Sequence, residues 1–195
     1  MNKTELIQKL NEFNTYASEI FELSFPKKTW RIRRKIHYQK GKGTHSWLEG
    51  MPKKEAIKAS CNDLRKFIQP NDTLEIKKLT PLYNSNLIDQ SEKLTFNKIM
   101  SSFDKLNQEK VSIFIDGEQL TRKKILEVFL YGNYSHRSEE AKKIHDSWQK
   151  NHPLVYQDLE AEFIVTLNLL LQIINNLASL NKMVLEKLKF GSSGP

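Results

Sequence analysis

The feature that most constrains the fold is a long Leu-rich segment near the end of the chain, from about residue 154 to 188. Its most apolar part, FIVTLNLLLQII at 163–174, is interrupted by Thr166, Asn168 and Gln172 and is followed by two asparagines. A membrane-spanning helix needs about 20 predominantly apolar residues, so this run is too short and too polar to cross a bilayer. We therefore expect one long helix in the centre of a soluble bundle, with no membrane partner.

Shorter segments supply the other expected helices. Residues 4–22 are capped by Thr4 and repeat apolar residues at steps of three and four: Leu6, Leu10, Phe13, Ala17 and Ile20. Further helices are predicted over 52–67, 91–106, 121–131 and 138–150. The helix at 91–106 is expected to bury Leu94, Ile99, Phe103 and Leu106. Gly132 follows the helix at 121–131 in the position where a glycine often ends a helix.

Two segments favour β structure. VSIFIDGEQL at 111–120 predicts a hairpin, because Asp116-Gly117 is a strong tight-turn signal between apolar runs. The segment 29–47 alternates apolar with basic residues and predicts a strand with one basic face. Residues 73–90 predict a loop with a short strand at 74–79. The expected fold class is mainly α (α+β), a helical bundle with a small β element.

The chain is expected to form a single α-rich domain over residues 1–190, with a basic arm at 27–54. Residues 191–195, GSSGP, resemble a flexible tail or a remnant of cloning. A single cysteine, Cys61, excludes an internal disulfide and a cysteine-based zinc site within one chain, and it favours a cytoplasmic location. No cofactor motif appears, and we expect neither a cofactor nor a metal.

The positive charge is concentrated in the basic segment, residues 27–54. This segment carries ten lysines and arginines and one acid, Glu49, a balance of 10 − 1 = +9, whereas the whole chain carries +8. The rest of the chain therefore sums to about −1. Arginine and lysine neutralise phosphates and aromatic rings stack on unpaired bases, so we expect nucleic-acid contacts from these residues: Lys27, Lys28, Arg31, Arg33, Arg34, Lys35, Lys40, Lys42 and Trp47.

RNA is favoured over duplex DNA, because the segment contains aromatic residues and no recognition helix stands out. The alternative is a non-catalytic interaction or inhibitor protein that docks an acidic protein partner through the same segment. In either case the long apolar final helix offers an interface for a homodimer.

A second candidate site lies in FLYGNYSHRSEEAKKIH, residues 129–145. Ser138 begins the next helix, so His136 and Arg137 precede a helix N-terminus, where unpaired amides can hold a phosphate. His136 can act as a general base or acid, Arg137 can stabilise phosphoryl charge, and Asn133 can orient either group. A structural role for His136 remains the alternative, and His145 and His152 are expected to be structural.

The helical arrangement over about residues 91–189, with a histidine at a helix junction, resembles the HEPN superfamily of phage-defence and toxin–antitoxin proteins. The resemblance implies a metal-independent ribonuclease whose motif is an arginine and a histidine separated by four to six residues. The nearest match is Asn133-Tyr-Ser-His136, in which the arginine is missing and Gly132 stands before Asn133. Arg31 and His37 have the motif spacing but lie in the predicted strand. The departure implies either a divergent site with Arg137 as substitute or an inactive one.

Overall fold

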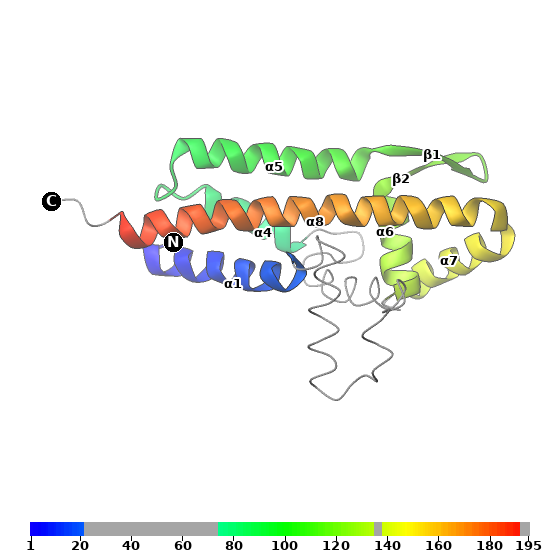
Figure 1. The fold of residues 1–195 in the computed structure, drawn as a ribbon, viewed down its shortest axis with the longest axis horizontal. Helices are drawn as coiled ribbons and strands as arrows, with labels where there is room; N and C mark the ends of the chain where they lie inside the picture. Colours follow the sequence, from blue (N-terminus) through cyan, green and yellow to red (C-terminus); the bar gives the residue numbers. More distant parts are fainter. Residues whose placement is uncertain (22–73, 135–137, 192–195) are drawn as a thin grey trace, which may run out of the picture.

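The computed structural model describes residues 1–21, 74–134 and 138–191, and it is mainly helical with one two-stranded antiparallel hairpin. The long helix α8 (Pro153–Phe190) runs the length of the molecule (Figure 1). Helices α1 (Lys3–Phe21) and α5 (Gln90–Gln108) pack against it along much of its length. The expected mainly α class with a small β element is confirmed. The predicted strand at 29–47 and helix at 52–67 lie outside the described residues.

The core is built on the buried face of α8. Apolar residues recur along this helix at helical spacing, among them Leu159, Phe163, Leu170, Leu177 and Val184. Leu6 and Leu10 of α1 and Phe96 of α5 are buried in the same core. These residues explain why α1 and α5 lie along α8, since each helix removes its apolar face from water there.

Helix α8 agrees with the helix predicted at about 154–188 and is much longer than the apolar run at 163–174. Within the described ranges it is the one helix that meets the length and composition of a membrane span. Half of its apolar window is buried inside the fold, and core helices of soluble proteins meet the same criterion. The expectation that this segment is too short and too polar to span therefore does not hold by length and composition alone.

The hairpin agrees with its prediction. Strands β1 (Lys110–Ile115) and β2 (Glu118–Thr121) pair antiparallel, with Ile115 opposite Glu118. Asp116 and Gly117 both have positive φ, 51° and 83°, which is the conformation of a tight hairpin turn. Alternate residues of β1, Val111, Ile113 and Ile115, are buried.

The prediction of a loop with a short strand over residues 73–90 was wrong for residues 74–83, whereas residues 84–89 form the predicted loop. Residues 74–83 form a helix, α4 (Leu74–Tyr83), instead of a loop with a short strand. Ile76, Leu79 and Tyr83 are buried at steps of three and four, so the helix has an apolar face. Burial of this face offsets the conformational entropy lost when the helix forms. Pro81 lies in the last turn and removes one intrahelical hydrogen bond there, a loss that the burial of the apolar face offsets.

Two smaller expectations also need correction. Helix α5 buries Phe96, Phe103 and Leu106, but Leu94 is 53% exposed and Ile99 is half-buried, because the apolar face is rotated from the predicted one. At the start of α1 the cap is Asn2, whose side-chain oxygen accepts a hydrogen bond from the Glu5 amide at 2.9 Å, and not Thr4.

The remaining helices lie around the first half of α8 (Figure 1). Helix α6 (Arg122–Glu127) follows the hairpin and continues directly into a π-helix, η2 (Val128–Tyr134). Helix α7 (Glu139–Asn151) leads to α8 through His152, with Pro153 at the first position of α8. The predicted break at Asn151–Pro153 is confirmed.

Candidate functional site at the η2–α7 junction

The structure describes one of the three residues proposed as catalytic. Asn133 is half-buried near the end of η2, whereas His136 and Arg137 lie outside the described residues. The whole basic segment 27–54 also lies outside them, including Arg31 and His37 and every residue proposed to contact nucleic acid. The structure therefore describes the junction through the elements on either side of His136, which are η2 before it and α7 after it.

The elements before the junction are a capped helix and a π-helix. Thr121 caps α6 by accepting a hydrogen bond from the Lys124 amide at 3.1 Å. The helix then continues as the wider π-helix η2, in which four residues are buried: Val128, Phe129, Leu130 and Tyr131. Segments of π-helix are rare and occur frequently at functional sites, which makes this junction a candidate site.

Gly132 does not end the helix, as the sequence suggested, but lies inside η2. A Cβ at this position would collide with the carbonyl of Ala141 and would lie 2.9 Å from the Lys142 amide nitrogen, both in α7. The glycine is therefore required because the backbones of η2 and α7 approach each other closely there. The correction changes the role of the residue from a helix terminator to a packing contact.

Helix α7 begins as predicted. The Ser138 hydroxyl accepts a hydrogen bond from the Ala141 amide at 3.2 Å, and the Ser138 amide donates to the Tyr131 carbonyl at 3.3 Å. Glu139 and Glu140 occupy the first turn, where acidic side chains are favoured by the helix dipole. The start of α7 is thus tied to η2 by a backbone hydrogen bond.

A small cavity lies between α6, η2 and α7. It has a volume of about 70 Å³ and is lined by Lys124, Glu127, Tyr131, Ser138 and Glu140 among others. A space of this size is too small for a nucleotide. Two of its charged residues are acidic, so the described part of the junction is not itself a phosphate-binding surface.

His145 is buried in α7 and uses both ring nitrogens. Its Nε2 lies 2.7 Å from the Tyr156 hydroxyl and its Nδ1 lies 3.3 Å from a carboxylate oxygen of Asp146. Burial, and then the charges of Glu160 and Asp146, raise the pKa of Tyr156, so its hydroxyl stays protonated and shares a hydrogen bond with Nε2. The imidazole also packs edge-on against Phe129 of η2. His145 therefore joins α7, α8 and η2, as a structural residue does.

His152 connects the corner between α7 and α8 to the hairpin. Its Nε2 lies 3.6 Å from a carboxylate oxygen of Asp116 in the β-turn. Across the residues that the structure describes, no three histidine, cysteine or acidic side chains gather closely enough to hold a metal ion.

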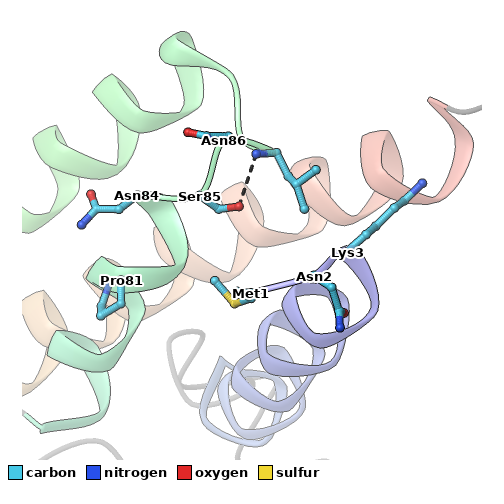
Figure 2. Close-up of a pocket in the computed structure, with 8 residues that line it drawn as sticks. Met1, Asn2, Lys3, Pro81, Asn84, Ser85 and Asn86 are labelled. Carbon is cyan, nitrogen blue, oxygen red and sulfur yellow. Dashed lines mark hydrogen bonds between the residues drawn. The ribbon is translucent and has the colours of Figure 1, made fainter.

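A second, larger cleft lies at the other end of the molecule, between the start of α1 and the α4–α5 connection (Figure 2). Its volume is about 520 Å³, and Figure 2 shows the Met1 side chain extending toward Pro81. The Ser85 hydroxyl accepts a hydrogen bond from the Leu87 amide at 3.2 Å. The side chains lining this cleft are neutral apart from Lys3, so they provide little basis for catalysis.

A polar cluster that the sequence does not signal lies where α4, α5 and α8 meet. Glu92 is buried, accepts a hydrogen bond from the Asp89 amide at 3.0 Å and pairs with Lys187 at 2.6 Å. The Tyr83 hydroxyl donates to the Asn181 side-chain oxygen at 2.5 Å. Asp89-x-x-Glu92 matches a helix-start pattern, but the pairings across about 100 residues have no local signature.

Comparisons with protein-family models, curated proteins and solved structures found no match to this chain. The resemblance to the HEPN superfamily therefore remains a prediction from the residues.

Proposed function

We propose that the protein binds nucleic acid through the basic segment 27–54, and that it prefers RNA to duplex DNA. The observation that carries this proposal is the charge of +9 within 28 residues, in a chain whose other residues sum to about −1. Confining so much like charge is unfavourable unless an anion neutralises it, and a phosphate backbone is the most general anionic partner. Trp30, Tyr38 and Trp47 add aromatic surfaces on which unpaired bases can stack.

The described residues support this proposal indirectly, because three of their cations, Arg122, Lys123 and Lys187, are engaged with acids. Arg122 bonds to Glu109 and Glu162, and Lys187 bonds to Asp89 and Glu92. Lys123 pairs with Glu127. These ion pairs reduce the charge that the described surface can offer to a polyanion.

We further propose a metal-independent ribonuclease activity at the η2–α7 junction. His136 would take the proton from a ribose 2′-hydroxyl, whose oxygen would attack the adjacent phosphorus and expel the 5′-oxygen, which takes a proton from water. Arg137 would stabilise the phosphoryl oxygens, and Asn133 would orient one of them. The supporting observation is that these residues flank the end of a π-helix and precede Ser138, the N-cap of a 13-residue helix.

One gel tests both proposals. Labelled single-stranded RNA and duplex DNA are incubated with the protein in excess EDTA, at low and moderate salt. We expect a shift of the RNA at low salt that weakens at moderate salt. Cleavage that His136→Ala abolishes without reducing the shift would support the ribonuclease, and a shift without cleavage would contradict it. Neither shift nor cleavage would contradict the binding proposal and favour an acidic protein partner.

A charge-matched pair of variants locates the binding surface. Changing Arg31, Arg33 and Arg34 together to glutamine should reduce the slope of log Kobs against log salt by about two, at roughly 0.7 per phosphate contact on single strands. The control changes three exposed lysines elsewhere, Lys9, Lys98 and Lys150, to glutamine and removes the same charge. Equal loss of affinity in both variants would show that net charge, and not the segment, determines binding.

A further inference from the structure

No further inference is drawn: the strongest candidate, the groove between α5 and α8 that Ile99, Leu180 and Met183 line beside the buried Glu92, carries none, because Glu92 is already engaged by Lys187 and the Asp89 amide and nothing in the part of the chain that the structure describes shows what covers the groove.

Discussion

At the residue scale, Gly132 shows how one missing side chain sets the distance between two helices. Its Cα faces the α7 backbone so closely that any Cβ would meet the Ala141 carbonyl. Neighbouring backbone atoms cannot move aside as a flexible side chain would, since α7 is also held by Ser138 and by His145. The position is therefore determined by tertiary packing and not by a turn.

Gly132→Ala should destabilise the protein by about 2 kcal/mol or more, because the added methyl group must push η2 away from α7. Urea unfolding followed by circular dichroism measures this loss. Asn133→Ala, next in the same π-helix, is the control and should cost less than about 1 kcal/mol. Equal losses in the two variants would contradict the close approach.

Tyr83 gives the protein a specific response to alkaline pH. Burial, and secondarily the negative charge of Glu92, raise the pKa of its phenol above the usual value of 10.0. The folded state therefore holds the proton more tightly than the unfolded state. The stabilisation is fully present below pH 10 and is lost as the pH rises above it.

Unfolding free energy measured from pH 9 to 11.5 should therefore fall with increasing pH. Tyr83→Phe should reduce the steepness of that fall, although it also removes the hydrogen bond to Asn181 and lowers stability at neutral pH. A slope that is identical in the variant would show that Tyr83 does not contribute to it.

At the scale of elements, Arg122 joins the hairpin, α6 and α8. Its guanidinium bonds to Glu109 before β1, and to Glu162 and Thr166 of α8 at 2.7 Å and 3.3 Å. Desolvation lowers the pKa of Arg122, but the bonds to Glu109 and Glu162 outweigh it and the net pKa is raised. The planar guanidinium can satisfy three acceptors at once, which an ammonium group cannot do with the same geometry.

Arg122→Lys should lower the free energy of unfolding although it keeps the charge, because an ammonium group cannot reproduce the three bonds of the guanidinium. The loss should be only about 1 to 2 kcal/mol, because both carboxylates are partly solvated. Lys123→Arg, on the next residue of α6, should have little effect. A double-mutant cycle with Glu162→Gln should show coupling, and additive losses would argue against a direct bond.

Elements with local signals were predictable, and elements determined by distant contacts were not. The hairpin followed from Asp116-Gly117, and α7 followed from Ser138. Helix α4 was missed because Pro81 and the polar residues after it obscured the apolar face. The π-helix was missed because its extra residue has no sequence signature, and its glycine was taken for a helix end. Of the candidate site, the structure tests only the surroundings of Asn133.

At the scale of the whole molecule, α8 has one face buried in the core and another exposed to solvent. The buried face of α8 organises α1 and α5, as the periodicity of the sequence predicted in outline. The exposed positions of α8 could not be predicted from the sequence, because leucines dominate the whole segment and mask the boundary between its two faces. The charges follow the same rule. The basic segment was apparent from the sequence, whereas the ion pairs of Arg122 and Lys187 with distant acids were not.

The course of α1 and α8 has a practical consequence for the order of the chain. Helix α1 starts where α8 finishes, with Asn14 of one bonded to the Ala178 carbonyl of the other, so both ends of the described chain lie at the same end of the molecule (Figure 1). A short peptide could therefore join them, and new termini could be opened in the exposed Asp116-Gly117 turn. Such a permuted gene would keep every helix and would place affinity tags at the end farthest from the present termini.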